Sequence, residues 1–153
     1  MRAKQANTRR RGLAKTINQR YLRYSYEGET IRLPMVTIRL RGGDKSVKTA
    51  ALVDSGATAS FVPPEFVEIL GMPLGEASTA SGAGGDFRTH LSKITIEVLK
   101  GVQVACRIDD EVHVPLEAGR VPYVVLGRDT IFLQYDITFR EHREVTILRK
   151  PKF

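Results

Sequence analysis

The chain has little of what a secreted or membrane-inserted protein needs. It contains a single cysteine, Cys106, so one chain cannot form an internal disulfide. No apolar run approaches the length of a membrane-spanning helix, and the basic N-terminal residues are not followed by the hydrophobic segment of a signal peptide. These absences predict a soluble protein without a membrane partner, in a reducing compartment that we expect to be the cytoplasm.

Acidic residues are missing from the N-terminal end of the chain. Residues 1–26 contain eight basic residues and no acidic one, whereas the remainder contains 16 basic and 17 acidic residues. The formal net charge of +7 therefore belongs to this end. We interpret residues 1–20 as a basic, flexible tail and residues 21–153 as one folded domain. The tail could be solvated disorder, bind nucleic acid or an acidic partner, or be removed by self-cleavage.

The remaining sequence is dominated by short strand patterns. Apolar residues alternate over residues 31–40 and 91–99, and glycine-containing turns recur between the apolar segments. Two short helices are expected, over residues 60–70 and 130–134. Many short strands with two brief helices predict an all-β domain that is closed or folded over on itself.

The segment after residue 50 contains the first candidate for chemistry. The apolar run Ala51-Leu52-Val53 leads directly into Asp54-Ser55-Gly56-Ala57. A carboxylate at the end of a buried strand lies where water is scarce, so its protonation can be tuned for acid–base catalysis. Asp, Ser and Gly are also the usual turn residues. This motif alone therefore leaves a catalytic and a purely structural interpretation open.

A second motif, Val124-Val125-Leu126-Gly127-Arg128-Asp129, follows later, and the glycine-rich segment Ser81–Asp86 lies between the two. In this order the three segments resemble the retropepsin-type aspartic proteases, over roughly residues 24–150. The resemblance implies a closed retropepsin-like β-barrel with one or two short helices, a flap hairpin and a homodimer. It also implies that the protein needs no metal and no organic cofactor.

The resemblance assigns roles to the motif residues. Asp54 would be the catalytic carboxylate, and because the chain has only one such motif, a second copy would supply the second carboxylate. The residues that would support the active-site loop are Ser55, Gly56, Ala57, Leu126, Gly127 and Arg128. The residues that would form the substrate-binding flap are Ser81, Gly82, Ala83, Gly84 and Gly85.

These roles predict an aspartic endopeptidase that binds extended peptides and activates water between two Asp54 carboxylates. Two alternatives stay open: a non-catalytic, dimeric peptide-binding or scaffold module of the same fold, and a nucleic-acid-binding protein that uses residues 1–20. One position departs from the family. Retroviral relatives carry an aspartate two places after the motif glycine, which pairs with the arginine of the second motif, but this chain has Thr58 there. Arg128 therefore needs another acceptor.

Other candidate residues have simpler interpretations. Asp109, Glu111 and His113 alternate along one predicted strand and could share a face, as metal ligands do. We interpret them as an exposed, charged strand face. Cys106 has no neighbouring catalytic motif, so we expect it to be a small buried residue.

Overall fold

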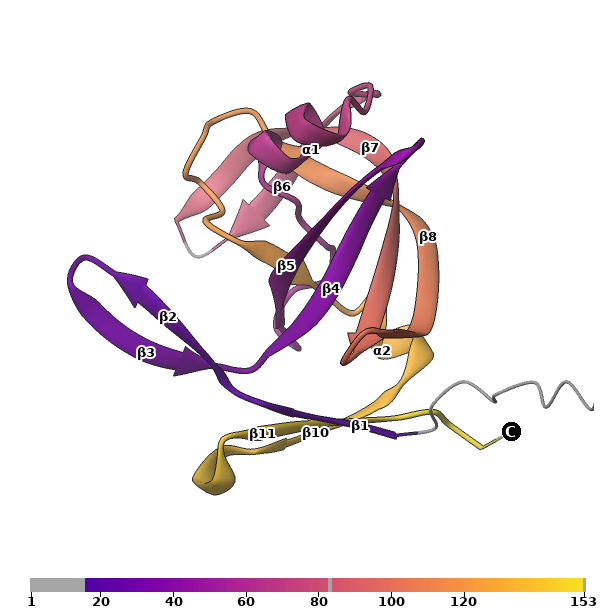
Figure 1. The fold of residues 1–153 in the computed structure, drawn as a ribbon. Coiled ribbons are helices and arrows are strands. Elements are labelled where there is room, and N and C mark those ends of the chain that lie inside the picture. Colours follow the sequence, from indigo (N-terminus) through magenta and orange to yellow (C-terminus); the bar gives the residue numbers. More distant parts are fainter. Residues whose placement is uncertain (1–15, 83, 153) are drawn as a thin grey trace, which may run out of the picture.

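The computed structural model describes residues 16–82 and 84–152, in which strands far outnumber helices (Figure 1). The strands are β1 Thr16–Arg20, β2 Leu22–Tyr26, β3 Glu29–Leu33, β4 Met35–Gly42, β5 Lys45–Val53, β6 Ala77–Gly82, β7 Gly85–Lys100, β8 Gln103–Pro115, β9 Val124–Leu126, β10 Asp136–Arg140 and β11 Val145–Arg149. The helices are α1 Pro64–Leu70 and α2 Ile131–Gln134, with a 3-10 turn, η1, at Glu141–Arg143. The prediction of an all-β chain with two short helices is confirmed.

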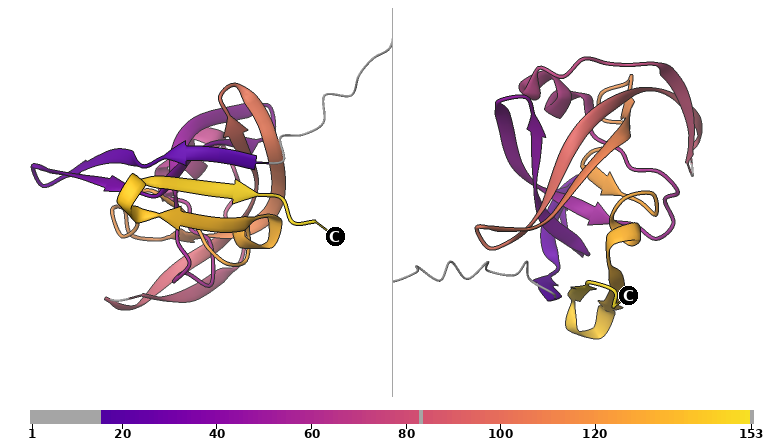
Figure 2. Two further views of the ribbon diagram at one scale, coloured as in Figure 1. Left: turned by 90° about the horizontal axis from the view of Figure 1, so that it is seen from below. Right: turned by 90° about the vertical axis from the view of Figure 1, so that its right-hand side faces the viewer.

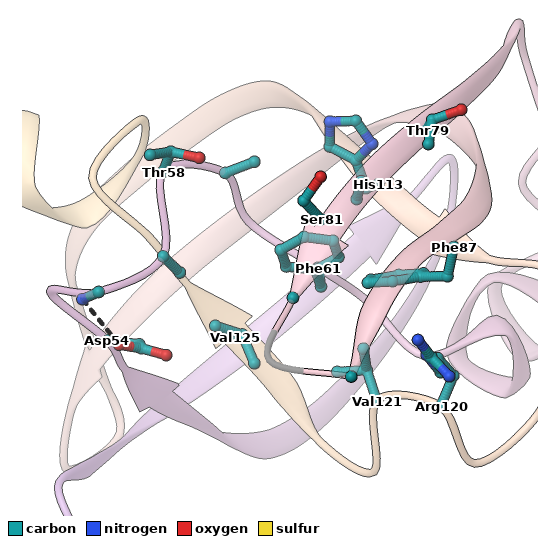
Figure 3. A pocket seen from close by; sticks show the side chains of 16 residues that line it. Asp54, Thr58, Phe61, Thr79, Ser81, Phe87, His113, Arg120, Val121 and Val125 are labelled. Carbon is teal, nitrogen blue, oxygen red and sulfur yellow. Dashed lines mark hydrogen bonds between the residues drawn. The ribbon is translucent and has the colours of Figure 1, made fainter.

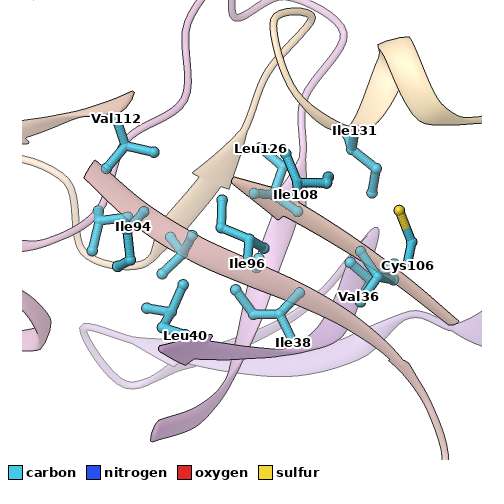
Figure 4. Close-up of a cluster of buried hydrophobic side chains, with 14 of the residues drawn as sticks. Val36, Ile38, Leu40, Ile94, Ile96, Cys106, Ile108, Val112, Leu126 and Ile131 are labelled. Atoms are coloured by element: carbon cyan, nitrogen blue, oxygen red, sulfur yellow. The ribbon is translucent and has the colours of Figure 1, made fainter. Parts of the chain in front are cut away.

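The main sheet has the strand order β6-β7-β4-β5-β9, and β8 pairs with β7. All its neighbours are antiparallel except β5 and β9, which run parallel. The sheet curves around a core of aliphatic side chains from β4, β7 and β8 (Figure 4). On β4, Ile38 and Leu40 are fully buried while Arg39 and Arg41 face outwards, because successive side chains of a strand point to opposite faces.

The segment around Phe61 connects strand β8 to strand β9. Phe61 and Val125 of β9 exchange two backbone hydrogen bonds of 2.9 Å, while the residues on either side of Phe61 hydrogen-bond to His113 of β8 at 2.9 and 3.0 Å. Over the described residues, the named strands themselves do not form a continuous ring. The predicted closed barrel is therefore not present as a ring of strands, and β8 and β9 are joined only through the segment around Phe61.

A second, three-stranded sheet has the order β1-β11-β10 and lies below the main sheet, and the β2–β3 hairpin extends away from the body (Figures 1 and 2). Residues 16–20 were predicted as part of a flexible tail, but they form β1, paired with β11 from Thr16–Arg149 to Arg20–Val145. The strand is held because Ile17 is buried in the main core. The strand pattern was weak because Ile17 is the only aliphatic residue in it. Residues 1–15 lie outside the described residues.

The two helices begin and end close to the predicted positions. Helix α1 starts at Pro64, later than expected, because residues 60–62 are extended and bridge the sheet. It ends at Leu70, as predicted, and Gly71 caps it in the left-handed conformation that favours glycine. Of the helices in the described part of the chain, none has the length and hydrophobicity required to cross a bilayer.

Candidate active site

Asp54 lies directly after β5, where the parallel pair β5–β9 ends. Its backbone N–H donates to the Leu126 carbonyl at 3.1 Å, continuing the pairing of Val53 with Leu126. The chain then turns, and the N–H of Gly56 donates to Asp54 Oδ1 at 2.8 Å. The Asp54 side chain is half-buried, and among the described residues no basic group lies within 4.0 Å of it. The carboxylate is thus oriented by a backbone amide and not neutralised by a cation.

The second motif packs against this turn through Gly127. A Cβ atom added at Gly127 would lie 2.7 Å from the Ala57 carbonyl oxygen and closer still to that of Ala59. Real Cβ atoms do not approach oxygen so closely, so any side chain here would push the active-site loop away from β9. Glycine at this position is therefore required by the contact between the two motifs.

Ser60 joins the two motifs by hydrogen bonds. Its buried hydroxyl accepts from the Gly127 N–H at 2.9 Å and donates to Asp129 Oδ1 at 2.7 Å, and it lies 2.8 Å from the Thr130 hydroxyl. All these groups find partners within one buried network, which fixes the loop without using Asp54. The sequence analysis missed Ser60, because a serine after a turn carries no specific signal.

The remaining loop residues predicted from sequence have separate positions. Ser55 and Arg128 are exposed, Leu126 is fully buried, and Ala57 lines the cavity described below. The backbone N–H of Arg128 donates to the Ala57 carbonyl at 2.8 Å. Within residues 16–82 and 84–152, no carboxylate lies within 4.0 Å of the Arg128 guanidinium. The acceptor that Arg128 needs is therefore not in the described part of its own chain.

The predicted flap segment is the end of the β6–β7 hairpin. Ser81 pairs with Asp86 and Gly82 pairs with Gly85, so Gly84 lies at the tip of the hairpin. Gly85 has φ +97°, a conformation in which a side chain would be strained. The Ser81 hydroxyl donates to Asp86 Oδ1 at 2.5 Å beside the tip. Ala83, the remaining predicted flap residue, lies outside the described residues.

Asp54 and the hairpin line one cavity of about 740 Å³ (Figure 3). Its apolar surface comes from Phe61, Phe87, Val121 and Val125, and its polar surface includes Thr79, Ser81, His113 and Arg120. Among the described lining residues, Asp54 is the only carboxylate. The cavity thus combines a carboxylate, a glycine-rich hairpin and apolar walls, a combination suited to binding an extended peptide.

Several cavity residues escaped the sequence analysis. His113 was interpreted as part of an exposed strand face, but it lines the cavity, and its Nδ1 lies 2.9 Å from the Thr89 hydroxyl. Phe61 stacks between two other cavity residues, with its ring centroid 5.6 Å from that of His113 and 5.8 Å from that of Phe87. These residues come from segments distant in sequence, and only the fold brings them together.

The other candidates behave as interpreted. Asp109 and Glu111 are exposed, and within the described residues no cluster of three or more His, Cys, Asp or Glu side chains could hold a metal ion. Cys106 is buried, and this burial raises the pKa of its thiol. The nucleic-acid hypothesis depends on residues 1–20, of which only 16–20 are described, so it stays a prediction.

The chain is similar to proteins of known family and fold. A family model described as aspartyl protease matches residues 35–130, which include Asp54, the hairpin and Gly127. A retropepsin-like aspartic protease from Rickettsia conorii is 18% identical, with a TM-score of 0.57, over 88% of this chain and 99% of that chain. The EIAV protease is 22% identical, with a TM-score of 0.47, over 69% of this chain and 89% of that chain. The search of curated proteins gave no match. The Rickettsia structure shows that this chain has a retropepsin-like fold.

Proposed function

Since the chain belongs to the aspartyl protease family, we propose that it is an aspartic endopeptidase whose active site is built from two copies of the chain. The observation that carries this proposal is the setting of Asp54. Its carboxylate lies in a peptide-sized cavity, is oriented by the Gly56 N–H, and has no basic partner among the described residues. These features are compatible with a carboxylate that takes part in acid–base catalysis.

The chemistry needs a second carboxylate. Two carboxylates that face one water share a single proton, because two like charges at that separation cannot both ionise. The ionised one takes a proton from the water as it attacks the peptide carbonyl, and the protonated one donates to the carbonyl oxygen. Since Asp54 is the only carboxylate among the described residues of the cavity, we propose that the Asp54 of a second copy completes the pair.

The substrate would be an extended peptide lying between the β6–β7 hairpin and the Asp54 loop. Backbone groups at the end of the hairpin would pair with the peptide backbone, as an added strand pairs with a sheet edge. Phe61, Phe87 and Val125 would contact apolar side chains of the substrate. In this proposal Ser81 to Gly85 act as the flap over the bound peptide.

Subunit mixing tests the shared site directly. Wild-type protein is held at a fixed concentration above its dimer dissociation constant, and increasing amounts of the Asp54→Asn variant are added. Each mixed dimer has one carboxylate, so cleavage of a reporter peptide should fall as the variant captures wild-type subunits, to about a quarter of the initial rate at a threefold excess. Dilution of wild type alone should lower the specific activity.

The control for mixing is the same excess of an unrelated protein, which cannot pair with the wild-type chain. It should leave the wild-type rate unchanged. A wild-type rate that does not respond to a large excess of Asp54→Asn chains would contradict the shared site. Peptide binding by wild type without any cleavage would instead indicate the non-catalytic module.

A further inference from the structure

Arg120 lies on the wall of the same cavity, away from Asp54. It belongs to the loop between β8 and β9, where its backbone N–H donates to the Glu117 carbonyl at 3.4 Å. In Figure 3, Asp54 and Arg120 lie at opposite sides of the view, and Phe61, Val125 and Phe87 lie between them. A peptide that contacts Asp54 and continues along the cavity would therefore reach Arg120.

The Arg120 side chain is oriented by the hairpin. Its guanidinium carbon lies 4.9 Å from the centroid of the Phe87 ring. Its Nη2 lies 3.6 Å from the position that a Cβ atom on Gly84 would occupy, so the guanidinium lies beside the hairpin tip. Stacking on an aromatic ring uses the flat face of a guanidinium and leaves the N–H groups along its edges free to donate. Arg120 thus lies over the Phe87 ring, and the N–H groups that do not face the ring can donate.

No carboxylate in the described part of the chain lies within 4.0 Å of Arg120. Asp86 and Glu117 line a neighbouring depression together with Arg120, but neither pairs with it. Asp86 instead accepts the Ser81 hydroxyl. By contrast, Arg32, Arg39, Arg41 and Arg107 each have a carboxylate partner.

We propose that Arg120 is a specificity-determining residue that binds an acidic side chain of the substrate, next to an apolar residue that packs on Phe61 and Val125. A planar guanidinium binds a carboxylate through two parallel hydrogen bonds, which gives the pair a defined geometry. This inference rests on the proposed function, because it concerns the same peptide site. It adds a charged determinant to a site that also has apolar walls.

The test uses a synthetic library of octapeptides, acetylated and amidated so that they carry no terminal charge. The two central residues are Phe or Leu, and each flanking position carries Glu, Gln, Lys or Ala. Wild type should cleave peptides with Glu at one flanking position with a kcat/KM about tenfold above that of the matched Gln peptides. Arg120→Gln should reduce this ratio to about one, and Arg120→Glu should favour Lys at that position.

Two further variants sharpen the assignment. Arg120→Lys keeps the charge but not the paired donors, and should retain a preference for Glu that is smaller than in wild type. Arg88→Gln is the matched control, because Arg88 is exposed, follows Phe87 directly and does not line the cavity with Asp54. It makes the same change in net charge and should leave the Glu-to-Gln ratio unchanged.

Binding separates this inference from the proposed catalysis. The same peptides, labelled with a fluorophore, are titrated with the Asp54→Asn protein and with its Arg120→Gln derivative. Tighter binding of Glu peptides that depends on Arg120, without cleavage by wild type, would support the acidic site and contradict the protease. Cleavage without a preference for Glu, or a preference that survives Arg120→Gln, would overturn the acidic site alone. Absence of both binding and cleavage would overturn both.

Discussion

Two carboxylates of this protein have opposite surroundings. Glu97 on β7 is almost completely buried, with 1% of its side chain exposed, and it is paired with three arginines. Arg41 Nε donates to Glu97 Oε1, Arg107 Nη2 donates to Oε2 at 3.0 Å, and Arg39 Nη1 lies 3.6 Å away. Asp54 is less buried and has, among the described residues, one amide donor and no cation near its carboxylate.

The difference in ion pairing indicates a structural role for Glu97, whereas Asp54 has no ion pair among the described residues. Burial by itself would raise the pKa of Glu97, but the hydrogen bonds and charges of Arg41 and Arg107 outweigh it and lower the pKa. Glu97 therefore stays ionised and holds β4, β7 and β8 together from the outer face of the sheet. A carboxylate held by ion pairs in this way is suited to a structural role. Among the described residues Asp54 has no such partners, which is compatible with the proposed catalytic role.

The largest expected effect comes from Asp54→Asn. The amide oxygen of asparagine can still accept the Gly56 N–H, so the turn is kept, but the side chain cannot act as a base. Peptide cleavage should fall by at least about 10³-fold, while the midpoint of thermal unfolding should stay within about 2 °C of wild type. Asp44→Asn, in the exposed β4–β5 turn, is the control and should change neither quantity. Wild-type turnover in Asp54→Asn would refute the catalytic role of Asp54.

Glu97→Gln should show the reverse pattern. The substitution leaves three arginines without their common anionic partner, and the free energy of unfolding should fall by about 2 kcal/mol, because a charged acceptor is replaced by a neutral amide at a buried position. Activity per folded molecule should be unchanged. The control is Asp109→Asn, on the same outer face but exposed, which should cost less than about 0.5 kcal/mol. Chemical denaturation measures both, and equal losses in the two variants would contradict the role of Glu97.

The smallest expected effect is a change in the acid dependence of stability. The folded-state pKa of Glu97 lies below its unfolded value, near 4.5. Such a group contributes stability above its unfolded pKa and loses that contribution as the pH falls through the folded pKa. The free energy of unfolding of wild type should therefore decrease as the pH is lowered below about 4.5. The free energy of unfolding of Glu97→Gln should decrease less steeply over the same pH range. Parallel curves for the two proteins would show that other carboxylates dominate.

The Asp54 half of this comparison was visible in the sequence. Asp54 and Gly127 lie in short contiguous motifs, and each motif has the residue types that its local geometry demands. Glu97 was not recognised, because its environment depends on strand register: Arg39 and Arg107 lie opposite it on the two neighbouring strands. A sequence without known register gives no sign that three separate arginines converge on one glutamate.

The walls of the cavity were unpredictable for a related reason. Phe61 follows a turn and His113 ends a long strand, and a single bridge places them side by side. Arg120 gains its orientation only from Phe87, which belongs to another element. Strand β1 was missed because one aliphatic residue gives too weak an alternation to outweigh a basic, polar composition. Local motifs could thus be inferred, whereas long-range packing could not.

The parallel pairing of β5 with β9 has a consequence for the order of events in synthesis. Ala51 of β5 pairs with Val124 of β9, and the ribosome synthesises β9 much later than β5. The β5–β9 pairing therefore cannot form until β9 has been made. Contacts between distant segments form late, because closing a long loop costs entropy before the contact is made. A nascent or truncated chain that ends before Val124 contains Asp54 but lacks the β9 strand that pairs with β5 and accepts the Asp54 N–H. The complete setting of Asp54 can therefore form only after Leu126 has been synthesised.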